Sequence, residues 1–98
     1  MEINTSLSSS QAKFATWIEE EMPYLWPLFD FSKGELVSGS VDQFCAVASR
    51  GEQIMARFAA GVWCGSNQFN FDFIDAAAHL DEKQINVVTD WLKSPFWP

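Results

Sequence analysis

The hydrophobic positions of this chain fall into segments with helical spacing, separated by short stretches rich in glycine, proline and serine. The apolar positions of the first segment are Phe14, Trp17, Ile18 and Met22. Steps of three and four residues place such positions on one face of a helix. Ser9 or Ser10 can cap its start, and Pro23 ends it because proline has no amide hydrogen to donate. The pattern therefore predicts a helix over Ser10–Met22.

The strongest pattern begins after Ser40, which can cap a helix, and continues for three heptads. Its apolar seam consists of Val41, Phe44, Ala48, Gly51, Met55, Phe58, Val62 and Gly65. The unbroken spacing predicts one long helix over Val41–Cys64, ended by Gly65. A glycine inside a helix costs about 1 kcal/mol relative to alanine. We interpret Gly51 as a point where another backbone approaches closely, not as a break.

The last third of the chain predicts two shorter helices. Phe69–Phe73 alternates with polar residues as a strand does, but helical spacing follows directly, so we predict a short helix that begins near residues 70–72. Asp81 then caps a final helix over Glu82–Lys93, with Gln84 at the reciprocal position of a capping box. The buried stripe predicted for this helix is Ile85, Val88 and Leu92, with Trp91 beside it.

These elements predict an all-α fold, a compact bundle of three to four helices in one domain over residues 1–98. The Val41–Cys64 helix is its long central rod, and the first and last helices pack along it. Polar residues 1–8 are expected to fray. The alternative is an α+β fold in which Leu36-Val37 and Phe69–Phe73 form a small two-stranded ribbon.

Composition narrows the classes of function. The 98 residues are 48% hydrophobic, enough for a folded core, and carry a net charge of -7. This negative field repels phosphate backbones and anionic lipid, so we expect neither direct nucleic-acid binding nor membrane binding, and it attracts basic protein surfaces. Residues 1–12 resemble no secretory signal, and the longest apolar run, at residues 58–64, is far below the roughly 20 residues that span a bilayer. A cytoplasmic location is expected.

Few residues could carry chemistry. His79 is the only histidine, and Cys45 and Cys64 lack the spacing of a zinc site, so we expect buried, reduced thiols. Asp72, Asp75 and His79 could share one helix face and hold a divalent ion, although an Asp75–His79 pair explains the same spacing. We predict no catalytic residue, no metal site and no cofactor.

Two proline-bracketed aromatic segments follow the first and the last predicted helices. They are Pro23-Tyr-Leu-Trp-Pro27 and Pro95-Phe-Trp-Pro98. Each can fold back over one end of the core, or it can present Trp26, or Phe96 and Trp97, to a partner. The acidic run Glu19-Glu20-Glu21 is either a solvated helix face or a contact for a basic partner.

Residues 41–92 carry a resemblance to a known group. Its pattern is Gly51-Glu-Gln53…Arg57-Phe-Ala-Ala, then Trp63, then Phe71-Asp72…Asp75…Leu80-Asp81. This half of the chain resembles short uncharacterised accessory proteins of bacterial integrative elements and prophages, whereas residues 1–40 depart from them. The resemblance implies an accessory role with no established activity.

We therefore expect a non-enzymatic accessory protein that acts through protein–protein interaction. One form of this interaction is a homodimer formed through the seam or the aromatic segments. One alternative is an acidic nucleic-acid mimic or anti-defence inhibitor that occupies a basic groove, whose binding would weaken steeply with salt. Another is an enzyme or small-ligand protein with a pocket near His79 or Cys64.

Overall fold

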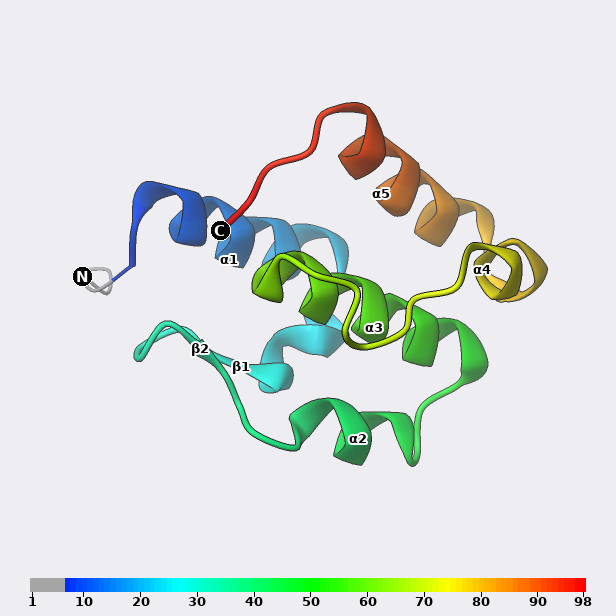
Figure 1. Ribbon diagram of the computed structural model, residues 1–98, viewed down its shortest axis with the longest axis horizontal. Coiled ribbons are helices and arrows are strands. Elements are labelled where there is room, and N and C mark those ends of the chain that lie inside the picture. The colour runs from blue at the N-terminus through cyan, green and yellow to red at the C-terminus, as the bar shows by residue number, and fades with distance from the viewer. Residues whose placement is uncertain (1–6) are drawn as a thin grey trace.

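The computed structural model describes residues 7–98, and this part of the chain is mostly helical with one small antiparallel ribbon (Figure 1). The elements are α1 (Ser9–Glu21), η1 (Pro23–Leu28), β1 (Phe29–Asp30), β2 (Glu35–Leu36), α2 (Ser40–Cys45), α3 (Arg50–Cys64), α4 (Phe73–His79) and α5 (Glu82–Lys93). The predicted helical character is confirmed. The all-α class is wrong because of the ribbon, and the α+β alternative fits better.

Helix α3 lies at the centre, with α2 below it and α5 above it in the view of Figure 1. Its buried residues include Met55, Ala56 and Ala59, whose exposed fraction is zero. The core continues into α1 through Phe14, which has edge-to-face contacts with Phe29 at 5.2 Å between ring centroids. The apolar seam of α3 and the face of α1 thus form one core, as the spacing predicts.

The long central helix is a wrong prediction, because the chain breaks between α2 and α3. Ser49 accepts a hydrogen bond from the amide of Glu52, and the Glu52 carboxylate accepts one from the amide of Ser49. This capping box starts a new helix. Val41 and Met55 still contribute to one core, since α2 turns back and packs on α3. The seam spacing is the same whether or not the helix is continuous.

Two predicted caps also shift by one residue. Ser8, not Ser9 or Ser10, caps α1 through a capping box with Gln11. Ser40 lies inside α2, where its hydroxyl donates a buried hydrogen bond to the carbonyl of Leu28 at 2.9 Å, and the preceding glycine takes the cap position. Of the segment expected to fray, residues 1–6 lie outside the described residues, while Leu7 packs against the core.

The ribbon pairs β1 with β2, in the register Phe29 opposite Leu36 and Asp30 opposite Glu35. Phe69–Phe73 was predicted to pair with the strand at Leu36-Val37, and this prediction is wrong. The partner is β1, which lies so close in sequence that a short turn joins it to β2. The turn is stabilised by the hydroxyl and amide of Ser32, which donate to the Asp30 carboxylate. These hydrogen bonds lower the pKa of Asp30 below its usual value.

The C-terminal helices follow the predicted boundaries. Asp72 caps α4, and Asp81 and Gln84 form the capping box of α5. Gly51 does not break α3: a side chain there would place its Cβ 3.0 Å from the Gln84 side chain and 3.4 Å from the carbonyl of His79. Gly51 is thus a point of close approach, as predicted, but the closest neighbour is the Gln84 side chain, whereas the expected backbone neighbour, at His79, lies at ordinary contact distance.

Candidate interaction groove

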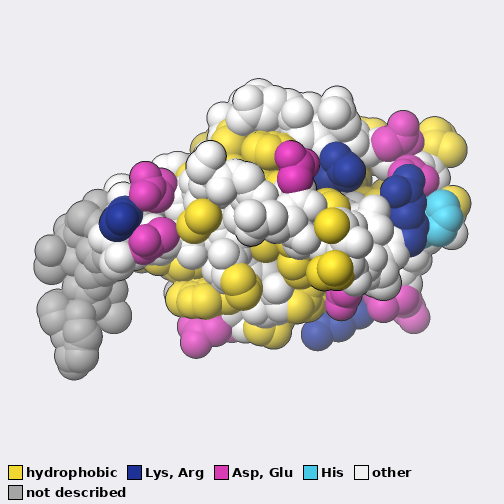
Figure 2. All heavy atoms as spheres, turned by 90° about the horizontal axis from the view of Figure 1, so that it is seen from below, with side chains coloured by type: hydrophobic (Ala, Val, Ile, Leu, Met, Phe, Trp, Pro, Cys, Tyr) yellow, Lys and Arg dark blue, Asp and Glu magenta, His cyan; other side chains and the backbone are white. Residues whose placement is uncertain are grey.

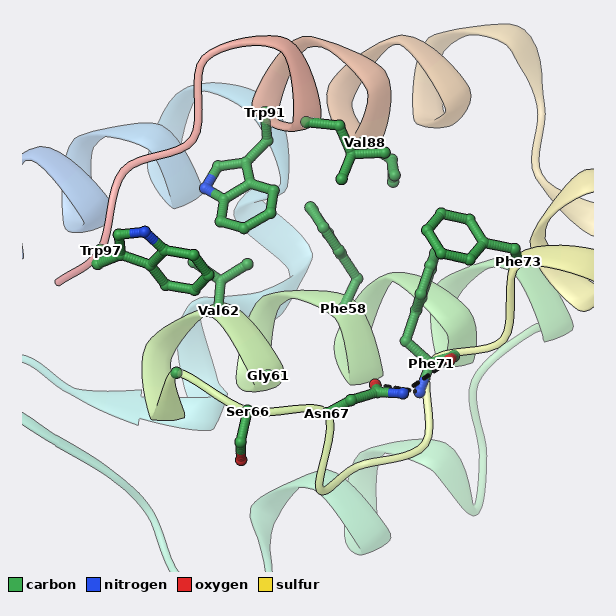
Figure 3. A pocket seen from close by; sticks show the side chains of 12 residues that line it. Phe58, Gly61, Val62, Ser66, Asn67, Phe71, Phe73, Val88, Trp91 and Trp97 are labelled. Atoms are coloured by element: carbon green, nitrogen blue, oxygen red, sulfur yellow. Dashed lines mark hydrogen bonds between the residues drawn. The ribbon is translucent and has the colours of Figure 1, made fainter.

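An apolar groove of about 330 Å³ lies between α3, the segment that follows it, α5 and the C-terminal residues (Figure 3). Its lining residues are Phe58, Gly61, Val62, Gly65, Ser66, Asn67, Phe71, Phe73, Val88, Trp91, Leu92 and Trp97. A second hollow of about 190 Å³ continues from it between α4 and α5, and the two share Phe71, Phe73, Val88 and Leu92. None of the residues that line either hollow is charged.

The lower wall is held by the side chain of Asn67. Its amide oxygen accepts a hydrogen bond from the amide of Phe71 at 2.8 Å, and its amide nitrogen donates to the carbonyl of the same residue at 3.1 Å. The positive φ of Asn70, 64°, completes the reversal of the chain. The Phe71 ring is thereby placed 5.5 Å from that of Phe58 on α3.

The opposite end of the groove is formed by the C-terminal residues. The indole nitrogen of Trp91 donates a hydrogen bond to the carbonyl of Phe96 at 3.1 Å. The Phe96 ring packs edge to face on Trp17 of α1, and the ammonium of Lys13 lies 4.5 Å from its centroid. Trp97 then turns towards the groove beside Trp91 (Figure 3). Two helices thus position the tail.

Four large apolar side chains that line the two hollows are also exposed to solvent. We call Phe73 (62% exposed), Ile85 (37%), Leu92 (46%) and Trp97 (58%) the apolar face. Ile74, next to Phe73 in α4, is 81% exposed. Monomeric proteins seldom expose contiguous apolar patches larger than a few hundred Å², and such patches often mark binding sites.

The apolar face corrects the predicted core of α5. Of the predicted stripe, Val88 is buried as expected, whereas Ile85 and Leu92 are exposed and Val87 is buried in their place. The helix has two neighbouring apolar sides, and only one of them can pack against α3. The other side becomes the wall of the groove.

Only some of the predicted interaction residues lie at the groove. Trp97 lines the groove and Phe96 anchors the segment that carries it. Trp26, 42% exposed, packs its ring 4.8 Å from that of Phe31 and does not line the groove. The run Glu19–Glu21, at the end of α1, does not line it either.

In the predicted cluster around His79, the imidazole packs beside Asp75 on the same helix rather than forming a pocket wall. The His79 imidazole lies 3.3 Å from the Asp75 carboxylate, which also pairs with Arg50 of α3. Asp72 accepts the amide of Asp75 as a helix cap. Within residues 7–98 no group of three or more His, Cys, Asp and Glu side chains could hold a metal ion. His79 does not line the groove.

The expectation of two buried thiols is wrong for Cys64, which is exposed at the end of α3. Cys45 is half-buried, and its thiol donates a weak hydrogen bond to the carbonyl of Gln53. Burial raises the pKa of the Cys45 thiol. Neither cysteine lines the groove, although Gly65, which does, follows Cys64 directly.

Acidic side chains do not gather into one field on the face shown in Figure 2, where they lie beside lysine and arginine side chains. Among the described residues, no helix is long and apolar enough to cross a membrane. Comparisons with protein-family models, with curated proteins and with solved structures returned no match for this chain.

Proposed function

We propose that this chain is a non-enzymatic interaction protein that binds another macromolecule through the apolar face. The observation that carries the proposal is the exposure of Phe73, Leu92 and Trp97 around an uncharged groove. When a partner covers these side chains, the removal of their apolar surface from water favours binding by roughly 25 cal/mol per Å² of buried area. Aromatic side chains at the centre of an apolar patch are the usual anchors of protein interfaces.

The shape and chemistry of the groove support a macromolecule as the ligand. A small-molecule site places a few polar groups around its ligand to orient it. Here the side chain of Asn67 is already engaged with Phe71, and the Ser66 side chain points away from the groove (Figure 3). The exposed side chains also extend beyond the groove to Ile85. This arrangement suits an apolar helix face better than a small polar substrate.

An accessory role in a bacterial mobile element, as the sequence resemblance implies, agrees with such a protein. The acidic-mimic alternative has less support, because basic residues interrupt the acidic side chains on the face of Figure 2. The net charge of -7 is then a source of solubility.

Site-specific photo-crosslinking tests the proposal. A photoreactive phenylalanine analogue replaces Leu92 in cells that naturally make the protein, and a second variant carries it at Val47. Val47 is 88% exposed and lines neither hollow of the groove, so it is a matched control. We expect covalent adducts with a defined protein at Leu92 and not at Val47. Equal adducts at both positions, or none at Leu92, would overturn the proposal.

A further inference from the structure

Helix α5 presents an apolar stripe that is suited to a second helix. Ile85 and Leu92 are seven residues apart, which is two turns, so they lie on the same side of α5. Both are more than one third exposed, and Val88 between them forms the floor of both hollows. A repeat of seven residues is the spacing at which two helices pack side by side.

Charged residues of opposite sign flank the two ends of this stripe. Glu82 lies in the first turn of α5 and Lys93 in the last. They are eleven residues apart, which places them on the same edge of the helix and about 16 Å apart along its axis. Both are exposed, and neither has an ion-pair partner within residues 7–98. They are too far apart to pair with each other inside one chain.

We infer that the apolar face binds a second copy of this chain, with the two α5 helices antiparallel across a two-fold axis. In that arrangement Leu92 of each copy packs beside Ile85 of the other. Glu82 of each copy then faces Lys93 of the other, so the two-fold axis generates two ion pairs. A parallel arrangement would instead oppose glutamate to glutamate and lysine to lysine. This inference rests on the function proposed above.

The size of the surface agrees with a weak dimer. A fully buried aromatic side chain contributes about 150–250 Å². The partly exposed side chains of the apolar face in two copies, with the groove between them, would bury on the order of 1,000 Å², which is about the smallest area of a biological interface and fits a weak dimer. The net charge of -7 on each copy opposes association at low ionic strength. At physiological salt this repulsion is largely screened between charges that are more than about 8 Å apart.

Charge exchange across the interface tests the inference. Glu82→Lys makes both pairs repulsive, and so does Lys93→Glu, so each variant alone should dimerise about tenfold more weakly than the unmodified chain. Mixing the two variants restores opposite charges at both contacts. Sedimentation equilibrium at physiological salt should therefore show a dimer in the mixture that neither variant forms at the same concentration. If a substitution weakened dimerisation only by destabilising its own helix, mixing the two variants would not restore the dimer. Recovery in the mixture therefore reports on the contact between copies.

Lys83 and Asp90 provide a matched control on the same helix. Each lies two residues from a stripe residue, about 200° around the helix, and points away from the apolar face. Lys83→Glu and Asp90→Lys should leave dimerisation unchanged, alone or mixed. An equal effect of these control variants, or no recovery when the Glu82 and Lys93 variants are mixed, would overturn the antiparallel arrangement.

The failure of this inference is distinguishable from that of the proposed function. If the unmodified chain sediments as a single chain at every concentration, the second copy is not the partner. The apolar face would then still give Leu92 adducts with a different protein in the crosslinking experiment. If neither a dimer nor an adduct forms, both proposals are wrong.

Discussion

The indole rings of Trp91 and Trp97 meet edge to face, with their centroids 5.0 Å apart. Trp91 is half-buried on α5, whereas Trp97 is largely exposed, so one ring anchors the other at the edge of the groove. The carbonyl of Phe96, bound by the Trp91 indole, fixes the backbone between them. The C-terminal residues are thereby positioned as part of the apolar face.

Trp97→Ala should weaken dimerisation more than it weakens the fold. An aromatic pair contributes about 0.5–1.5 kcal/mol beyond its buried area, so urea unfolding should show a loss of about 1 kcal/mol in the monomer. Sedimentation should show a clear rise in the dimer dissociation constant. Trp26→Ala is the control, because Trp26 has a comparable aromatic contact with Phe31 away from the groove. A Trp26 variant that dimerises as weakly would contradict the account.

The break between α2 and α3 depends on Ser49. Ser49→Ala removes the hydroxyl that accepts the amide of Glu52 and should lower the free energy of unfolding by about 1 kcal/mol. Ser66→Ala changes an exposed serine beyond the end of α3 and should have almost no effect. Urea unfolding of the three proteins measures the difference. Equal stability of both variants would show that the cap does not set this boundary.

Tyr24 should make stability fall at alkaline pH. Burial raises the pKa of its phenol above the usual value of 10.0, assisted by the carboxylates of Glu52 and Asp81 and opposed by a hydrogen bond with Gln84. The neutral phenol is therefore favoured in the fold. This contribution is complete well below pH 10.0, the pKa at which the phenol of the unfolded chain is half ionised, and is lost as the pH rises through the folded pKa.

Tyr24→Phe removes this dependence. We expect the unmodified chain to lose more stability than the variant between about pH 9 and pH 11. Because Tyr24 is the only tyrosine, the near-ultraviolet absorbance of its phenolate gives the folded pKa directly. A transition at or below 10.0 would contradict the structural assignment of Tyr24 as partly buried.

Much of the fold follows from local signals in the sequence. Pro23 ends α1 within one residue of the prediction, and Asp81 with Gln84 marks the start of α5. The break at Ser49 also has a local signal, the Ser49-x-x-Glu52 capping box, which the unbroken apolar seam obscured. The predicted strand at Leu36-Val37 overlaps β2 at Leu36, but its partner β1 was missed because strands of two residues are too short to show alternation.

The candidate site was only partly predictable. The proline-bracketed segment after the last helix indicated that Trp97 could be presented to a partner, and Trp97 does line the groove with its side chain exposed. Ile85 and Leu92 look like core residues in the sequence, since spacing places them on one side of α5 but cannot say which side packs. That choice depends on how Val87 and Val88 meet α3 in three dimensions. Apolar residues form both protein cores and protein interfaces, so the residue types of α5 could not show which of its sides is exposed.

The mass of the chain in solution tests the central claim most directly, measured by sedimentation equilibrium at physiological salt for the unmodified protein, Leu92→Glu and Val47→Glu. Both substitutions place the same charge at an exposed apolar position, so neither should disrupt the core. We predict a mass of two chains for the unmodified protein and for Val47→Glu, and of one chain for Leu92→Glu. A single chain in all three proteins, or a dimer that survives Leu92→Glu, would contradict the account.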